Sequence, residues 1–304
     1  MKNPISYLAY WAKIHPEKAA IQNTVSRFSY RDLFDRVCRI SAKLKARGVK
    51  PQQKVLLSMS EDHFRWIFSL ALLHAGVTVI SHVSFKPSDS KDDKSYEWIV
   101  SDKSMDIGEN KNLILIDHIW LSSVKDSLLD LNFYEYTDND LIAIFTTSGT
   151  TGQAKKVAWH LDHLEQRAKS EIFNTGAGGK ITTMNSTSNL GFYVGFSCFV
   201  FGETLFTQAC NEEVIDLVIK NNIKTIHGSP AQISSLINTL IEKSPTDLIG
   251  RVDKVITAGS IASQSLLENI HKYFGAPLFS DYGSTETGFA CRALVTSSGD
   301  LNLI

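Results

Sequence analysis

The sequence predicts an α/β protein in which parallel sheets are covered by helices on both faces. Strand-like and helix-like segments alternate along almost all of the 304 residues, an order that is typical of such sheets. The strand-like segments are short apolar runs, and the clearest helical segment is amphipathic. We therefore expect a doubly wound α/β architecture.

The N-terminal part of the chain contains three of the expected helices. Ile5–Ala12 is too short and too interrupted by polar groups for a signal peptide, and it predicts an amphipathic helix. Tyr30–Arg47 predicts a second helix that ends at Gly48, because apolar residues recur on one face and Lys and Arg lie opposite. Its apolar face is formed by Leu33, Val37, Ile40 and Leu44. A third helix and two flanking strands are expected at Glu61–His74, Lys54–Met59 and Gly76–Ile80.

The rest of the chain continues the alternation. Strands are expected at Leu113–Ile116, Leu141–Phe145, Lys180–Met184, Lys224–Ile226, Lys254–Thr257 and Pro277–Phe279. Helices are expected at 160–173, 212–221, 230–242 and 263–274. Phe192–Phe201 is the most apolar run, and at ten residues it is too short to span a bilayer, so it predicts a buried helix. Lys86–Ser95 predicts an exposed polar loop, and a boundary between two sheet units is expected there or near residues 130–140.

Composition and charge exclude several classes of protein. Apolar residues make up 43% and charged residues 21% of the chain, which indicates a soluble globular protein. The net charge of −1 gives no basic footprint for nucleic acid. The four cysteines form no C-x-x-C pair, so neither a zinc site nor a disulfide framework is indicated, and a reducing cytoplasm is expected. They are Cys38, Cys198, Cys210 and Cys291.

The most informative segment is Phe145–Val157, which combines hydroxyl residues, two glycines and two lysines directly after the apolar run Leu141–Phe145. Glycines let backbone N–H groups turn toward an anion, hydroxyls add donors, and a lysine adds a point charge. The segment is not a Walker A loop, because Gly152 is followed by Gln153 rather than by Lys and Ser or Thr. It predicts either a phosphate-binding loop or a surface turn rich in Ser, Thr and Gly.

A second informative segment is Ser280–Gly288, with the sequence Ser-Asp-Tyr-Gly-Ser-Thr-Glu-Thr-Gly. An aromatic face suits a nucleobase, a hydroxyl suits a phosphate oxygen, and a carboxylate suits a hard cation. Taken alone, Tyr282–Glu286 equally fits a turn that leads into a helix N-cap.

Together the two segments resemble the signature motifs of the adenylate-forming enzymes, which are the acyl-CoA synthetases, the adenylation domains of nonribosomal peptide synthetases and the luciferases. Thr147–Lys155 matches the family pattern T-S-G-[ST]-T-G-x-P-K-G, except that Ala154 replaces Pro and Lys156 replaces Gly. Tyr282–Glu286 matches the family pattern Y-G-x-T-E. Loss of the proline removes a fixed φ and makes the loop less pre-organised.

The resemblance implies a particular fold and extent. It implies two mostly parallel sheets packed together, with the nucleotide between them. The expected organisation of residues 1–304 is a partial N-terminal adenylation domain with two sheet subdomains, which lacks the small C-terminal lid domain and its catalytic lysine. The chain ends at Ile304, sixteen residues after Gly288, and corresponds to about the first two-thirds of the family's length.

The resemblance also implies roles for individual residues. Thr285 contacts the α-phosphate, Glu286 holds Mg²⁺, and these two residues act with Lys155 as the catalytic set. The implied ATP phosphate-binding residues are Thr147, Ser148, Gly149, Thr150, Thr151, Gly152 and Lys155. The implied adenine-binding residues are Gly259, Ser260, Asp281, Tyr282 and Gly283. For Gly259, an ordinary turn after a strand is the alternative.

The acid pocket implied by the resemblance contains Asn189, His227 and Gly228. Amino-acid-activating relatives carry an Asp where this sequence has Asn189, and an unpaired substrate ammonium would be costly. We therefore expect an aryl or acyl acid rather than an α-amino acid. Asn189 equally fits a helix N-cap, and His227 fits a hydrogen-bonded core histidine. His227–Gln232 resembles a strand end followed by a helix that begins at Pro230.

The activity implied by the resemblance is ATP-dependent formation of an acyl-adenylate. The acyl group is then normally transferred to the thiol of CoA or of an acyl or peptidyl carrier protein. The full-length form is expected to be an AMP-forming carboxylate ligase of the acid–thiol type. The alternative is a catalytically incomplete module that binds a nucleotide or an acyl group. A P-loop kinase or NTPase is disfavoured, because Gly-Lys-Ser/Thr is missing.

Overall fold

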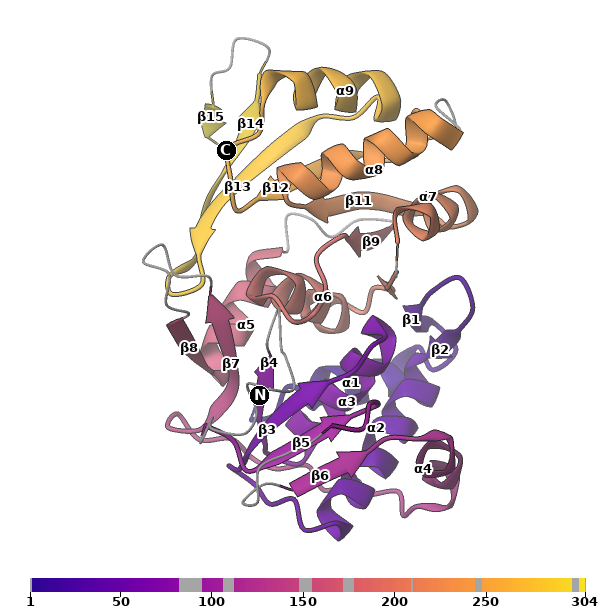
Figure 1. Ribbon diagram of the computed structural model, residues 1–304, viewed down its shortest axis with the longest axis vertical. Coiled ribbons are helices and arrows are strands. Elements are labelled where there is room, and N and C mark those ends of the chain that lie inside the picture. The colour runs from indigo at the N-terminus through magenta and orange to yellow at the C-terminus, as the bar shows by residue number, and fades with distance from the viewer. Residues whose placement is uncertain are drawn as a thin grey trace. The chain divides into compact units, whose positions relative to one another are not determined.

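Two β-sheets organise the chain in the computed structural model, whose ribbon is shown in Figure 1. The structure describes residues 2–81, 95–105, 112–147, 155–171, 178–208, 210–243, 248–296 and 301–303. The chain divides into two compact units. Unit 1 contains residues 1–18, 28–166 and 186–189, and unit 2 contains residues 19–27, 167–185 and 190–304.

Within the described residues, the sheet of unit 1 has six strands in the order β6-β5-β3-β4-β7-β8. Neighbours from β6 to β7 are parallel, and β8 adds an antiparallel edge. The central strands β3 and β4 bury residues on both faces, which is typical of parallel strands. The strand bounds are β3 Lys54–Ser58, β4 Thr78–Ser81, β5 Trp98–Ser101, β6 Asn112–Leu115, β7 Leu141–Thr147 and β8 Lys155–His160.

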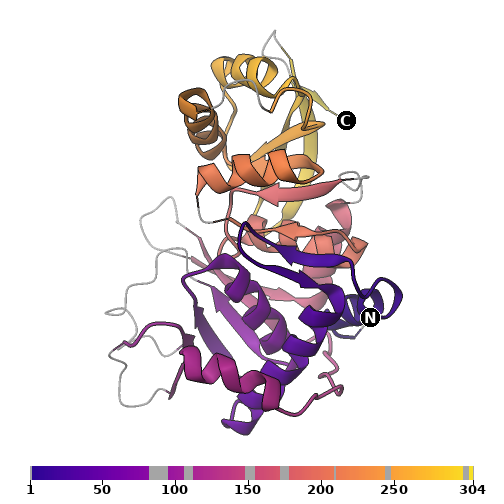
Figure 2. The same cartoon turned by 90° about the vertical axis from the view of Figure 1, so that its right-hand side faces the viewer.

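Helices α2 and α3 lie side by side against the sheet of unit 1 (Figures 1 and 2). A capping box begins α2, because the Ser29 hydroxyl accepts from the Asp32 amide at 3.1 Å and the Asp32 carboxylate accepts from the Ser29 amide at 3.2 Å. Gly48 follows its end with a φ of 98°, as the sequence predicts. The helices of this unit are α1 Ile5–Ile14, α2 Tyr30–Ala46, α3 Asp62–His74, α4 His118–Ser122 and the 3₁₀ helix η2 Ser123–Asp126.

In the part of the chain that the structure describes, the second sheet has nine strands in the order β15-β14-β13-β12-β11-β9-β10-β1-β2. Strands β1, β10, β9, β11, β12 and β13 pair in parallel, whereas β14 and β15 are antiparallel to their neighbours. The bounds are β1 Ala19–Gln22, β2 Arg27–Ser29, β9 Gly179–Thr182, β10 Leu205–Phe206, β11 Ile223–Gly228, β12 Lys254–Ala258, β13 Leu278–Ser284, β14 Gly288–Val295 and β15 Leu301–Leu303.

Three helices of unit 2 share one buried apolar cluster with strands β9 to β14. Leu217 of α7, Ile237 of α8 and Ile270 of α9 are buried in it. Burial of such side chains contributes roughly 1.5–3 kcal/mol each, so this cluster holds the helices on the sheet. The remaining bounds are α5 Leu161–Ser170, α6 Asn189–Phe201, α7 Asn211–Lys220, α8 Pro230–Lys243 and α9 Gln264–Phe274.

The observed elements confirm the predicted α/β class with two mostly parallel sheets covered by helices. The buried helix expected at Phe192–Phe201 is part of α6. The helix expected at 160–173 is α5, which begins one residue later, after β8, while residues 172–173 lie outside the described residues. Strand β8 was not predicted, because it begins with Lys155 and Lys156, although charged residues are common on edge strands.

The other differences concern short strands and the boundary. Strands β1, β2, β5, β10, β14 and β15 were not predicted, and most have only two to four residues; the short helices α4 and η2 were not predicted either. The division after Gln166 lies later in the chain than either expected boundary. The predicted polar loop Lys86–Ser95 lies outside the described residues except for Ser95. Within the ranges that the structure describes, no helix combines the length and apolar character needed to cross a membrane.

Candidate functional site

The β13–β14 hairpin carries the residues of the second sequence segment. Strand β13 ends at Ser284, residues 285–287 form the turn, and β14 begins at Gly288. The Thr287 amide donates to the Ser284 hydroxyl at 3.1 Å and closes the turn. Tyr282 is 73% exposed and Glu286 is exposed, so an aromatic ring and a carboxylate are accessible. The alternative of a turn that leads into a helix is therefore wrong.

Two glycines make this hairpin possible. A Cβ on Gly283 would lie 2.3 Å from the carbonyl oxygen of Gly288, a distance that real side chains do not adopt. Gly288 has a φ of 79°, in the region that favours glycine. The glycine of the Y-G-x-T-E pattern is thus required by the close approach of two strands.

The predicted adenine-binding residues and two of the predicted acid-pocket residues, His227 and Gly228, lie on or directly after strands β11, β12 and β13 of unit 2. Gly228 at the end of β11 aligns with Thr257 of β12, which aligns with Ser280 of β13. Gly259 follows the end of β12 with a φ of 91°. Because these strands are parallel, their carboxyl ends lie together, where α/β sheets place ligands. Ser260 follows Gly259 and is exposed.

Asp281 is held by an ion pair within unit 2. Its carboxylate accepts two hydrogen bonds from Arg292, each of 2.6 Å, and Asp281 is only 7% exposed. This two-point geometry is the strongest form of a carboxylate–arginine pair. It joins β13 to β14 beside Tyr282.

His227 lies in a buried charge cluster, which we define as Glu171, Lys180, Glu203, His227 and Arg292. Burial, with the positive charge of Lys180 beside it, lowers the pKa of His227 to about 3, so the ring is neutral at pH 7. Its Nε2 is 3.6 Å from the Glu171 carboxylate. The Lys180 ammonium lies 3.2 Å from Glu203 and 3.9 Å from Glu171.

The first sequence segment connects β7 to β8 in unit 1. These strands are antiparallel, with Thr146 opposite Lys156 and Thr147 opposite Lys155. Lys155 is exposed, and the Lys156 ammonium donates to the Ser95 hydroxyl at 2.9 Å. The predicted phosphate-binding residues between these strands lie outside the described residues. They are Ser148, Gly149, Thr150, Thr151 and Gly152.

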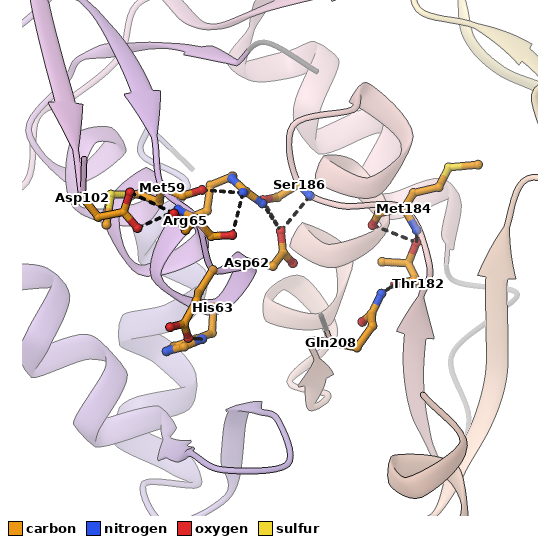
Figure 3. A network of polar contacts seen from close by, with 11 residues as sticks. Met59, Asp62, His63, Arg65, Asp102, Thr182, Met184, Ser186 and Gln208 are labelled. Carbon is orange, nitrogen blue, oxygen red and sulfur yellow. Dashed lines mark hydrogen bonds and ion pairs between the residues drawn. The ribbon is translucent and has the colours of Figure 1, made fainter. Parts of the chain in front are cut away.

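Asn189, the third predicted acid-pocket residue, is the first residue of α6 and is grouped with unit 1. The segment before it is tied to the start of α3, as Figure 3 shows. One oxygen of Asp62 accepts from the Ser186 amide at 3.0 Å and from the Ser186 hydroxyl at 2.8 Å. The same oxygen is 2.7 Å from Arg65, whose guanidinium also bonds to the carbonyl of Met59.

Comparison with known proteins agrees with this geometry. A match to the family described as AMP-binding enzyme covers residues 8–84 and 85–303. The chain belongs to the AMP-binding enzyme family. It is an N-terminal core of the adenylate-forming type.

Individual members of the AMP-binding family are distant in sequence. The chain is 25% identical over 311 residues to 4-chlorobenzoate–CoA ligase of Arthrobacter sp., covering 94% of this chain and 59% of the ligase. It thus spans about three-fifths of the length of that curated relative.

Solved structures of the AMP-binding fold match more closely in shape. O-succinylbenzoate coenzyme A synthetase (MenE) from Bacillus subtilis in complex with AMP has a TM-score of 0.78 at 16% identity, covering 98% of this chain and 80% of that chain. The N-terminal subdomain of Klebsiella oxytoca NpsA in complex with 3-hydroxybenzoyl-AMSN has a TM-score of 0.80 at 15% identity, covering 99% and 77%. At these identities the likeness concerns the fold.

Glu286 fits the kind of magnesium site that the AMP-binding family implies. No group of three His, Cys, Asp or Glu side chains suited to a metal occurs among the residues whose placement is described. Mg²⁺ is commonly held by one or two carboxylates together with phosphate oxygens and waters. A single exposed carboxylate on the hairpin turn meets that requirement once a nucleotide supplies the phosphates.

Several residues of this AMP-binding core were missed by sequence reasoning. They are Asp62, Arg167, Glu171, Lys180 and Arg292. For Lys180 and Arg292 the sequence does contain a signal, because each is a charged residue within an otherwise apolar strand. Asp62, Arg167 and Glu171 are on or beside amphipathic helices, where charged residues are ordinary, so their positions become informative only through their tertiary partners.

Proposed function

We propose that this protein binds ATP and activates a carboxylic acid as an acyl-adenylate with release of pyrophosphate. The observation that carries the proposal is the β13–β14 hairpin, which presents Tyr282 near the end of β13 and Thr285 and Glu286 on the turn that follows. Membership of the AMP-binding enzyme family supports the nucleotide.

The reaction requires positioning and charge neutralisation. An oxygen of the substrate carboxylate attacks the α-phosphorus, the bond to the β-phosphate breaks, and pyrophosphate leaves with the electron pair. Lys155 and the hydroxyls of the β7–β8 connection hold the β- and γ-phosphates in this proposal. Thr285 donates to the α-phosphate. Mg²⁺ supplies charge neutralisation when it is bound at Glu286.

Adenine would contact the edge formed by the ends of β12 and β13. Tyr282 offers an exposed aromatic face for stacking. Gly259 and Gly283 lack side chains and therefore let the backbone approach the base. Ser260 and Asp281 flank these positions.

We infer that the substrate is an aryl or acyl acid rather than an α-amino acid. The stretch Asn185–Phe192 contains no Asp or Glu to pair with a substrate ammonium, and a buried unpaired charge is costly. Asn189, His227 and Gly228 are the proposed lining residues. The similarity to 4-chlorobenzoate–CoA ligase supports an aromatic acid.

The acceptor of the acyl group is proposed to be the thiol of CoA or of a carrier protein, and the compartment the cytoplasm. Transfer to CoA is indicated by the name of the chlorobenzoate relative. None of the four cysteines, all of which lie in the described ranges, forms a disulfide, and burial raises the pKa of Cys38 and of Cys198 to about 12. Such thiols are unreactive, which is compatible with a reducing environment.

The test is ATP–pyrophosphate exchange across a panel of benzoates, aliphatic acids and amino acids, together with calorimetric titration of ATP in the presence of Mg²⁺. We expect exchange with an aryl or acyl acid and a Glu286→Gln variant with weakened Mg²⁺-dependent binding. ATP binding without exchange would favour the catalytically incomplete module. Absence of ATP binding, or metal dependence unchanged in Glu286→Gln, would contradict the proposed nucleotide site.

A further inference from the structure

Arg167 contacts the hairpin turn from inside unit 2. It lies on α5, is only 7% exposed, and its Nη2 donates to the carbonyl oxygens of Thr285 at 3.3 Å and of Glu286 at 3.1 Å. Both acceptors belong to the residues that the proposed function places against the α-phosphate and Mg²⁺. One buried guanidinium therefore binds the backbone of both.

The backbone carbonyls of this turn and the Glu286 side chain have different surroundings. The backbone carbonyls of Thr285 and Glu286 face the buried arginine, whereas the Glu286 side chain is exposed. The two N–H groups of Nη2 are held in the plane of the guanidinium, so bonds from this one nitrogen to two successive carbonyls constrain the orientation of both peptide groups. Constraining the peptide groups also limits the directions available to the two side chains.

Gly288 gives independent evidence that the hairpin is shaped around this arginine. A Cβ at that position would lie 2.8 Å from the Arg167 Nε and 3.1 Å from its Cζ. Gly288 is the first residue of β14, directly after the turn. The side chain of Arg167 thus occupies the space that any other residue at 288 would need.

We propose that Arg167 is a positioning residue that holds the β13–β14 turn in the conformation needed for ATP and Mg²⁺. It touches neither reacting group and acts through the backbone of Thr285 and Glu286. The expected effect on catalysis rests on the proposed function. The constraint on the conformation of the turn is independent of the proposed function.

The first test is hydrogen exchange followed by mass spectrometry on the ligand-free protein. Arg167→Gln should raise the exchange rate of the amides of residues 283–289 by about tenfold or more, because two charge-assisted bonds are lost. The matched control is Arg251→Gln, since Arg251 also donates to a backbone carbonyl of unit 2, that of Ile219 at 3.3 Å. The control should leave the hairpin unchanged. Unchanged exchange in Arg167→Gln would overturn the proposal.

A conservative variant covers the case in which Arg167→Gln does not fold. Arg167→Lys keeps the charge and the aliphatic stem but lacks the planar guanidinium and its Nη2, so it should give intermediate exchange at the same amides. Wild-type exchange at the hairpin in a folded Arg167→Lys protein would contradict the role assigned to the planar guanidinium.

The second test separates positioning from general stability. In pyrophosphate exchange, Arg167→Gln should lower kcat by about 100-fold through misplacement of Thr285 and Glu286, and Arg251→Gln should not. The KM for the acid should stay within about threefold, because the acid pocket is not altered. A rise in acid KM with an unchanged kcat would overturn positioning. Inactivity of the unsubstituted protein would instead contradict the proposed function, and the exchange test at the hairpin would still decide the role of Arg167.

Discussion

The buried histidine His74 makes the stability of unit 1 depend on pH. It is the last residue of α3, is fully buried, and its Nε2 lies 3.0 Å from the carbonyl oxygen of Asp130. Burial, with the positive charge of Lys45 beside it, lowers the pKa of His74 to about 4. In the unfolded chain the pKa returns to about 6.5. The unfolded state therefore binds a proton in a pH range where the folded state does not.

The sign of this effect follows from proton linkage. The stabilisation is complete above pH 6.5, where the ring is neutral in both states, and it is lost as the pH falls from about 6.5 to about 4. His74 should contribute on the order of 3 kcal/mol to the decrease in the free energy of unfolding across that window. In His74→Gln this contribution should be absent. Urea denaturation at a series of pH values measures the slope. The exposed His118→Gln should keep the wild-type slope, and an equally steep slope in His74→Gln would refute the assignment.

At the scale of elements, α3 fixes the segment that leads into α6. Asp62 accepts two hydrogen bonds from Ser186, which stands three residues before Asn189 (Figure 3). Gly191 adds a steric constraint, since a Cβ there would lie 2.2 Å from the carbonyl oxygen of Asn185. The proposed acid-pocket residue Asn189 is therefore placed by a helix far from it in sequence.

Asp62→Ala should loosen this segment and raise the KM for the acid by about tenfold, because charge-assisted hydrogen bonds are lost. The KM for ATP should change much less. The matched control is Asp102→Ala, because Asp102 accepts from the amide of Ser60 at 2.8 Å and from its hydroxyl at 3.2 Å in the same way. Steady-state exchange kinetics measure both constants. Equal effects of the two substitutions on the acid KM would argue against a role for Asp62 in the acid pocket.

At the scale of the whole molecule, the buried charge cluster joins parts of unit 2 that are distant in sequence. Lys180 on β9 is 1% exposed and lies between Glu171, which follows α5, and Glu203, which follows α6. Arg292 on β14 lies 4.0 Å from Glu171. Removing one member of a buried ion pair is far more costly than the net value of the pair, because its partner stays buried.

Lys180→Ala should therefore destabilise the protein by about 3–5 kcal/mol in chemical denaturation. The control is Lys220→Ala, which breaks an exposed pair with Asp216 of 3.0 Å and should change stability by less than about 1 kcal/mol. A loss of the same small size in Lys180→Ala would mean that the cluster does not stabilise unit 2.

Much of the fold was predictable because it depends on local patterns. The amphipathic face of Tyr30–Ala46, the cap at Ser29 and the stop at Gly48 all act within one helix. Strand β8 was missed, since Lys155 and Lys156 suggest a loop until Thr147 and Thr146 are seen opposite them. Short strands such as β1 are stabilised by pairing with β10, which lies far along the chain.

The family motifs, the α/β class and the chemical types available for a nucleotide site could be read from the sequence, because they depend on residues close together in the chain. That Tyr282–Glu286 forms a hairpin rather than the start of a helix became known from the fold alone. The same holds for the contact of Arg167 with that turn and for the place of His227 against Glu171. Such contacts join residues more than fifty positions apart. In the sequence, a charged residue that becomes buried looks like any other, because its desolvation and its partners depend on the tertiary fold.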